Sequence, residues 1–257
     1  MLFDSHAHMD VHEFDEDRDE LLERLKADKI SYILNPGVDL ETSRNAVKLA
    51  EKYPWIYAAV GYHPSETKGM DDDVLAMIEN MAKNPRVKAI GEIGLDYYWD
   101  KTPRDVQQHW FREQIRLAER LDLPIVIHDR EAHGDIKDIL VEEKAFERTR
   151  VLMHCYSGGA ELARQYSKLG CYFSVAGPVT YGNNKKAKAV LDVIPLDHMC
   201  IETDSPFLTP EPFRGKRNDP GLVEYTARKI AELKDITFEE VAAASMETAK
   251  KFFDIDD

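Results

Sequence analysis

Short apolar runs alternate with amphipathic segments along the whole chain, and this alternation restricts the fold more than any other feature. Two of the runs, Tyr57-Ala58-Ala59-Val60 and Ile125-Val126-Ile127, contain no charged residue. A strand that is apolar on both faces is typical of a parallel sheet covered by helices on both sides. Strands that alternate with helices in this way predict an α/β fold.

Eight strands are expected, and a helical segment follows each of them. The expected strands are residues 2–8, 31–36, 56–63, 87–93, 124–129, 150–156, 171–176 and 199–203. Helical periodicity occurs at residues 17–27, 40–52, 71–83, 103–121, 134–144, 160–169, 185–193, 220–233 and 238–253. Capping boxes are expected at two helix starts, from Thr102 to Asp105 and from Thr237 to Glu240. Eight such units predict a (β/α)8 barrel of the TIM type, with an open doubly wound sheet as the structural alternative.

The length and composition agree with one large acidic domain. The chain has 257 residues, of which 43% are hydrophobic, and no linker rich in Gly, Ser or Pro divides it, so one domain over residues 1–257 is expected. The formal net charge of −14 excludes a basic surface over the whole protein as the means of binding a partner. Three widely spaced cysteines are expected to be buried thiols. Neither a membrane-spanning run nor a secretory signal is found, which favours a cytoplasmic protein without membrane contact.

Histidines and acidic residues interrupt the apolar runs, nearly always close to the C-terminal end of a run. These residues are His6, His8, His63, Glu92, His128, His154, Glu202 and Asp204. In a barrel all strand ends of this kind open on the one face where active sites are built. Residues two apart on a strand point to the same side, so His6 and His8 are expected to converge, and likewise Glu202 and Asp204.

Titratable groups that meet from several strands need compensation, because their desolvation and mutual repulsion are costly. A divalent cation supplies that compensation, and imidazole nitrogens with carboxylate oxygens suit Zn, Mn, Fe and related ions. The candidate metal ligands are His6, His8, Glu92, His128, His154 and Asp204. Six ligands exceed what one tetrahedral ion needs, so two divalent cations per chain are expected, bridged by Glu92, with Zn, Mn, Mg, Co or Ni as possible identities.

Two acids are candidate catalytic residues. A metal-bound water has its pKa lowered towards about 7 and supplies a nucleophile at neutral pH. Asp204 is expected to ligate one ion, orient that water and carry its proton to the leaving group. Glu202 either supports the metal shell or points between its strand and a helix.

Four residues are candidate substrate contacts. His63 lies at the right strand end, where it either meets substrate or orients a loop. Arg130 lies two residues beyond His128 and shares its direction, which places a guanidinium near a bound phosphate. Arg217 and Asn218 belong to a locally basic loop after the last strand, which is a common phosphate-binding position in barrels or else an ordinary solvated loop.

Six motifs, taken in order, resemble those of the TatD family of metal-dependent hydrolases, within the amidohydrolase-like barrels. They are Asp4-Ser5-His6-Ala7-His8, Gly61-Tyr62-His63-Pro64, Gly91-Glu92-Ile93-Gly94-Leu95-Asp96-Tyr97, Pro124-Ile125-Val126-Ile127-His128-Asp129-Arg130, His154-Cys155-Tyr156-Ser157-Gly158 and Glu202-Thr203-Asp204-Ser205-Pro206. The resemblance implies a TIM-type barrel, two divalent ions and hydrolysis of phosphodiester bonds, typically in DNA. By position, it implies the same six ligands that the strand ends indicate.

The first functional hypothesis is therefore a deoxyribonuclease that cleaves phosphodiester bonds at DNA ends with a metal-bound hydroxide. The alternative is ester or amide hydrolysis at the same two-metal site, such as D-aminoacyl-tRNA deacylation. A metal-stabilised binding barrel without turnover is a third interpretation, and Asp204 argues against it because a structural site gains nothing from an acid placed to move a proton. Nucleic acid is the expected partner, and the oligomeric state stays open, with a monomer as one possibility.

Overall fold

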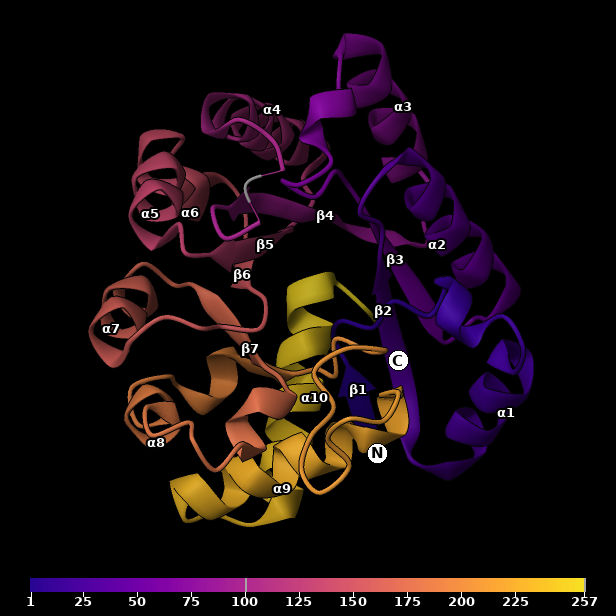
Figure 1. Cartoon of the computed structure of the whole chain (residues 1–257), viewed down its shortest axis with the longest axis vertical. Helices are drawn as coiled ribbons and strands as arrows, with labels where there is room; N and C mark the ends of the chain where they lie inside the picture. The colour runs from indigo at the N-terminus through magenta and orange to yellow at the C-terminus, as the bar shows by residue number, and fades with distance from the viewer. Residues whose placement is uncertain (100, 257) are drawn as a thin grey trace. The chain divides into compact units, whose positions relative to one another are not determined.

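The computed structural model describes residues 1–99 and 101–256, in which strands and helices alternate along the chain (Figure 1). The strands are β1 (Leu2–Asp4), β2 (Ile30–Pro36), β3 (Ile56–Val60), β4 (Val87–Asp96), β5 (Ile125–Arg130), β6 (Val151–Met153), β7 (Tyr172–Val175) and β8 (Met199–Ile201). The helices are α1 (Arg18–Asp28), α2 (Leu40–Lys52), α3 (Asp72–Ala82), α4 (Arg104–Leu121), α5 (His133–Glu142), α6 (Ala145–Arg148), α7 (Ala160–Lys168), α8 (Ala187–Leu191), α9 (Val223–Lys234) and α10 (Phe238–Phe253). The strands follow one another in the sheet in the order of the chain, which confirms the expected (β/α)8 arrangement.

Several strands end earlier than expected, so that site candidates lie just beyond them. β1 ends at Asp4 instead of residue 8, β3 at Val60 instead of residue 63, and β8 at Ile201 instead of residue 203. After β8 the backbone turns at Asp204, whose φ of 56° lies in the left-handed region that a strand does not contain. β4 differs in the other direction, because it continues to Asp96, three residues beyond its expected end.

One of the two expected capping boxes is wrong. The box at Thr237 and Glu240 is present, with reciprocal bonds between side chain and backbone. At α4, however, the N-cap is Pro103, which has no side-chain cap bond, and the hydroxyl of Thr102 instead donates to the Ser65 carbonyl at 2.9 Å. Thr102 lies one residue too early to cap the helix, because Pro103 already occupies the N-cap position.

The described chain divides into two compact units, of which the first comprises Met1–Asn35 and Gly158–Asp257. In this unit β1 pairs in parallel with β2, and β7 pairs with β8. Helix α10 packs on both β1 and β8, and α9 packs on the same two strands. The rings of Phe3 and Phe253 lie 5.9 Å apart in the resulting core and are fully buried. This packing fixes the ends of β1 and β8.

The second unit, Pro36–Ser157, contains the parallel strands β3 to β6, each paired with the next. Helix α2 packs on β3, and α4 packs on β4. Gly94 of β4 is the register partner of His128 of β5, and its φ is +140°. A Cβ atom at position 94 would lie 2.0 Å from the His128 carbonyl oxygen. Only glycine therefore allows β4 and β5 to approach closely at this point.

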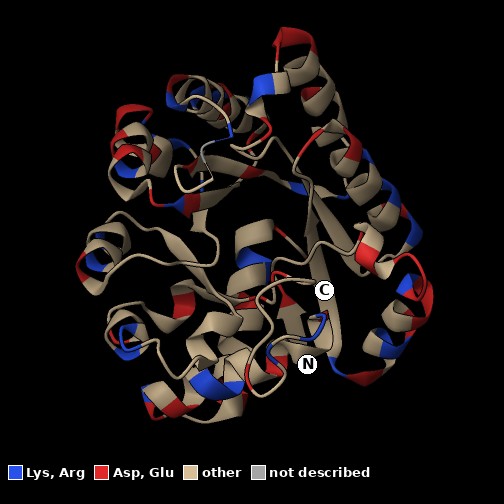
Figure 2. Ribbon diagram, viewed as in Figure 1, with Lys and Arg blue, Asp and Glu red and all other residues tan. Residues whose placement is uncertain are grey.

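Charged residues colour mainly the helices and loops of each unit, whereas the strands are largely tan (Figure 2). The exceptions include four buried acids near strand ends: Asp4, Glu92, Asp96 and Glu202. No helix in the described ranges has both the length and the apolar character required to cross a membrane. The expectation of one domain over residues 1–257 stays a prediction.

We expect Gly94→Ala to destabilise the protein by about 2–4 kcal/mol, because the added methyl group meets backbone and the φ angle disfavours alanine. The control is Gly134→Ala in α5, where a Cβ atom has nothing within 4 Å. This variant should be unchanged or up to about 1 kcal/mol more stable. Urea denaturation measures both, and equal stability of the two variants would contradict the packing account.

Glu143 links α5 to α4, and its stabilising effect should depend on pH. Its carboxylate accepts bonds from Arg112 at 3.1 Å and from Arg116 at 2.8 and 2.9 Å. Burial alone would raise the pKa of Glu143, but the bonds from Arg116 and Arg112 hold it below its ordinary value. A carboxyl with a lowered pKa in the folded state stabilises the protein above the unfolded pKa, and this contribution disappears as the pH falls through the folded pKa.

Glu143→Gln should therefore lower the free energy of unfolding by about 1 kcal/mol at pH 7. The difference from the parent should shrink as the pH is lowered below about 4.3, the ordinary value for glutamate. Denaturation curves at a series of pH values test this expectation. A difference that is the same at every pH would show that side-chain shape, not charge, is responsible.

Candidate metal centre

The first unit carries a cluster of two imidazoles and one carboxylate, His6, His8 and Asp204, just beyond β1 and β8. The Nε2 atoms of His6 and His8 are 3.3 Å apart. Oδ1 of Asp204 lies 3.4 Å from Nε2 of His8 and 3.8 Å from Nε2 of His6. His6 and His8 therefore converge as expected, although the extended strand has already ended before them. Three ligand-type atoms at these separations form a set that suits one divalent cation.

Backbone contacts between the ends of β1 and β8 hold this cluster in place. The amide of His8 donates to the Ser205 carbonyl at 2.8 Å, and the amide of Asp204 donates to the His6 carbonyl at 2.9 Å. Asp4, which sequence reasoning missed, accepts bonds from the Thr203 amide at 2.9 Å and from the Thr203 hydroxyl. Burial raises the pKa of Asp4 well above its ordinary value. The available signal was its position two residues before His6, within the first motif.

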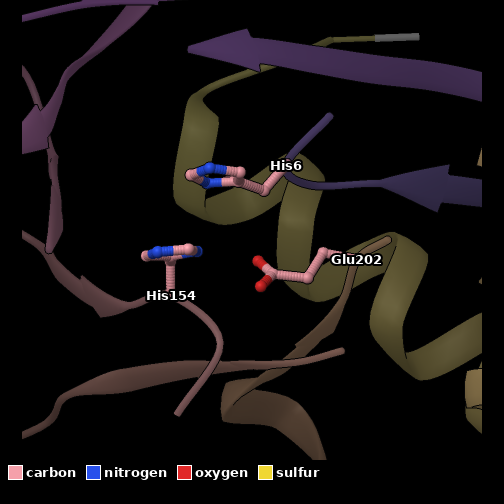
Figure 3. A group of neighbouring side chains, drawn as sticks. All are labelled: His6, His154 and Glu202. Carbon is pink, nitrogen blue, oxygen red and sulfur yellow. The ribbon is translucent and has the colours of Figure 1, made fainter. Parts of the chain in front are cut away.

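Glu202 is completely buried, and its carboxylate accepts a hydrogen bond from the Ser174 hydroxyl of β7. Figure 3 shows the carboxylate of Glu202, which follows β8, and the ring of His6, which follows β1. Whereas Glu202 bonds to a neighbouring strand, Asp204 lies against His6 and His8. The two acids therefore have different surroundings despite their spacing of two residues.

The second unit carries a cluster centred on the buried carboxylate of Glu92 in β4. Oε1 of Glu92 lies 2.8 Å from Nδ1 of His128, 3.0 Å from Nε2 of His154 and 3.7 Å from Nε2 of His63. The ligand atoms of His63, Glu92 and His128 all lie within 4.8 Å of one another. A single carboxylate oxygen thus faces three imidazole nitrogens, which come from β5 and from the segments after β3 and β6.

Asp96 belongs to the same cluster and was missed because β4 was expected to end at residue 93. Its Oδ2 atom lies 3.0 Å from Nε2 of His128, so both ring nitrogens of His128 face a carboxylate. The other oxygen, Oδ1, accepts the amides of Tyr98 and Trp99, each at 3.0 Å. Asp96 stands four residues after Glu92 in the third motif, and this even spacing was the available signal.

The charges of the second cluster follow from its burial and hydrogen bonds. Burial, together with the neighbouring His128, lowers the pKa of His63 to about 3, so this ring is neutral at pH 7. Burial alone would also lower the pKa of His128, but the bonds to Asp96 and Glu92 raise it above the ordinary value. Burial would raise the pKa of Asp96, and the bond from His128 together with two backbone amides lowers it instead.

The four candidate substrate contacts have different surroundings. His63 faces Glu92, and its Nδ1 atom lies 2.8 Å from the Ser65 hydroxyl. Arg130 is exposed, with its guanidinium carbon 4.1 Å from the ring centroid of Tyr98.

The other two candidate residues, Arg217 and Asn218, hold the loop after β8 through hydrogen bonds within the protein. The two terminal guanidinium nitrogens of Arg217 donate to the two carboxylate oxygens of Asp17, at 2.8 and 2.6 Å. Asn218 is buried, and its side-chain amide donates to the carbonyls of Thr203 and Phe207. Both side chains are therefore engaged within the protein. Their roles towards substrate stay predictions.

The donor set of both clusters fits divalent transition-metal ions. Each cluster combines imidazole nitrogens with a carboxylate oxygen, which are the ligands that Zn, Mn and related ions take in open hydrolytic sites. In the first cluster the ligands would be His6, His8 and Asp204. In the second they would be Glu92, His128 and His154. This assignment rests on the chemistry and spacing of the side chains within each unit.

Comparison with known proteins agrees with this chemistry. A family model described as TatD related DNase matches residues 3–254. The chain is 49% identical over 255 residues to the uncharacterized metal-dependent hydrolase YabD of Bacillus subtilis, which covers 99% of this chain and 100% of the relative. It is 34% identical over 260 residues to the uncharacterized metal-dependent hydrolase TatD of Mycobacterium tuberculosis, covering 98% of this chain and 97% of the relative.

Among solved structures, the crystal structure of YJJV, a TatD homologue from Escherichia coli K12, has a TM-score of 0.92 and 30% sequence identity. The match covers 99% of this chain and 98% of that chain. The sequence match and the structural match both extend over nearly the full length. The chain therefore belongs to the TatD family of metal-dependent hydrolases and has its amidohydrolase-like (β/α)8 barrel.

Proposed function

We propose that this metal-dependent hydrolase is a deoxyribonuclease that uses two divalent cations to cleave phosphodiester bonds. The observation that carries the proposal is the carboxylate oxygen of Glu92, which lies within 3.0 Å of imidazole nitrogens of both His128 and His154. The description of the matching family as related to DNases supports DNA as the substrate. The proposed ligands are His6, His8 and Asp204 from the first cluster and Glu92, His128 and His154 from the second.

The fold supports a catalytic role for the residues of both clusters. In a (β/α)8 barrel the C-terminal ends of all strands open on the same face, and catalytic groups come from several different strands. The proposed ligands lie within β4 and β5 or follow β1, β6 and β8. When bound, such cations act as Lewis acids towards phosphoryl oxygens and lower the pKa of water. Their positive charge also offers a local attraction for an anionic substrate on an acidic chain.

Within the first cluster we assign the proton transfer to Asp204. Its side chain is 16% exposed, compared with 4% for Glu92, so Asp204 is the acid that substrate can reach. Its carboxylate would accept a proton from the attacking water and return it to the leaving oxygen. Glu92 would instead bind a cation and keep the rings of His128 and His154 in position, because its oxygen already faces both imidazoles. Glu202 would support β8 through Ser174 without meeting substrate.

Asp204→Asn should keep most of the bound metal and lose about 10²–10⁴-fold in kcat, because the amide cannot take up the proton. Hydrolysis of end-labelled single-stranded DNA with Mg, Mn or Zn measures the rate, and elemental analysis measures the metal. The control Asp197→Asn changes an exposed carboxylate in the same unit and should behave as the parent. Equal rates for Asp204→Asn and the parent would remove Asp204 from the mechanism.

Glu92→Gln should lower the metal content of the purified and dialysed protein, because a neutral amide is a poorer ligand than a carboxylate. Activity towards DNA should fall by at least as large a factor. The matched control is Glu142→Gln, which removes an exposed carboxylate paired with Arg112 in the same unit. Full metal content in Glu92→Gln would contradict the assignment.

The same assays separate DNA hydrolysis from the ester alternative. The parent is incubated with single-stranded DNA and, in parallel, with D-aminoacyl-tRNA, in the presence of each metal. Cleavage of DNA supports the proposal. Turnover of D-aminoacyl-tRNA without cleavage of DNA would replace it, and an absence of turnover on both substrates would refute it.

A further inference from the structure

We propose that Tyr98, Trp99 and Arg130 form a stacking platform for an unpaired nucleobase of the substrate strand, an inference that rests on the proposed function and deepens it. The three residues belong to the second unit, where Tyr98 and Trp99 follow β4 and Arg130 ends β5. They lie beside the cluster that contains Glu92 and His128. The proposal assigns them a binding role that is separate from the metal ligands.

The two aromatic side chains are unusually exposed. Tyr98 is 50% exposed and Trp99 is 56% exposed, whereas the other tryptophans of the chain, Trp55 and Trp110, are each 8% exposed. The rings of Tyr98 and Trp99 meet edge to face with centroids 5.0 Å apart. Large aromatic surface left open to water beside a proposed active site is typical of a binding surface.

Arg130 indicates the chemistry of the occupant. Its guanidinium carbon lies 4.1 Å from the ring centroid of Tyr98 and 5.3 Å from that of Trp99. A guanidinium that stacks by its face keeps its in-plane N–H groups directed outwards, where they match the oxygens of a phosphate. Aromatic rings beside such a cation suit a ligand with a flat π face and an adjoining anion, which is a nucleotide.

The loop that carries the rings is held by several hydrogen bonds. The amides of Tyr98 and Trp99 both donate to Oδ1 of Asp96. The preceding Tyr97 is half-buried, and its hydroxyl donates to Asp135 at 2.6 Å. Arg104 stacks over the ring of Tyr97 at 4.1 Å. Because these hydrogen bonds fix the backbone at Tyr98 and Trp99, binding a base to the two rings costs little additional conformational entropy.

Asp96 also connects the platform to the proposed reaction centre. While Oδ1 holds the loop amides, Oδ2 contacts Nε2 of His128, whose other ring nitrogen contacts Glu92. A base on the platform would therefore have its phosphate close to Arg130 and next to the cluster. Stacking is tolerant of sequence because every base has a π face, so the platform would favour unpaired strands without selecting a sequence.

The test compares the binding of two oligonucleotides of equal length and charge in the presence of a chelator, which prevents hydrolysis. One is oligothymidylate, and the other consists of abasic residues. The parent should bind oligothymidylate about 5- to 150-fold more tightly. Trp99→Ala should lose most of that preference, Trp99→Phe should keep most of it, and both should bind the abasic strand like the parent.

The matched control is Tyr53→Ala, which removes an aromatic ring beside Lys52. Tyr53 lies before the N-terminal end of β3 and outside the platform. This variant should keep the preference for oligothymidylate. A parent that binds both strands equally, or a Trp99→Ala variant that keeps the full preference, would overturn the platform. Quenching of tryptophan fluorescence by oligothymidylate gives a second readout, and it should vanish in Trp99→Phe while binding remains.

The two proposals fail in distinguishable ways. A parent that cleaves no DNA with any metal, yet shows a Trp99-dependent preference for oligothymidylate, would refute the nuclease function and support the platform. If the parent cleaves DNA and the Trp99→Ala variant has the same KM for DNA as the parent, the nuclease function is supported and the platform is refuted.

Discussion

The burial of carboxylates at the ends of apolar strands is the constraint on which the rest of this site depends. Glu92 is almost inaccessible to water, and its oxygen can be accommodated only because imidazole nitrogens surround it. An unpaired buried carboxylate would instead shift its pKa upwards and lose its charge. The imidazoles offset part of the desolvation cost of the buried carboxylates, and the proposed cations would offset the rest. The same buried charges would therefore explain both the placement of these residues at the strand ends and the metal-dependent chemistry.

Further buried residues position the candidate ligands through hydrogen bonds. Asp96 fixes the ring of His128 and also orders the loop that carries Tyr98 and Trp99. Asp4 plays a comparable part in the first unit, where it binds the backbone and the hydroxyl of Thr203 next to Asp204. Each cluster is thus accompanied by a buried acid close in sequence to a candidate ligand, because Asp4 precedes His6 and Asp96 follows Glu92.

Much of this arrangement was predictable from the sequence, because it depends on local periodicity. The apolar runs predicted all eight strands, and the 3.6-residue pattern predicted α2 and α10 with their observed bounds. The strand ends were less predictable, because the hydrophobic pattern does not show where the backbone leaves the sheet. Asp204 illustrates this, since the left-handed turn at this residue separates it from Glu202 despite their even spacing.

Contacts between distant parts of the chain were outside the reach of sequence reasoning. Arg217 was expected either to meet phosphate or to lie in a solvated loop, and neither interpretation included its bond to Asp17, 200 residues earlier in the chain. No local sequence pattern predicts an ion pair between residues so far apart. Asp96 was missed for a different reason, because a β4 that ends at residue 93 would leave it in a loop. The sequence therefore predicts which residue types gather at the strand ends, while the order of contacts among them requires the fold.

The most direct test of the central claim is anomalous diffraction from crystals of the protein loaded with Mn or Zn, recorded at the absorption edge of the metal. The account predicts two anomalous peaks per chain, one bonded to His6, His8 and Asp204 and the other bonded to Glu92, His128 and His154. Peaks that are bonded to other residues, or a loaded crystal in which Glu92 contacts no metal, would contradict it.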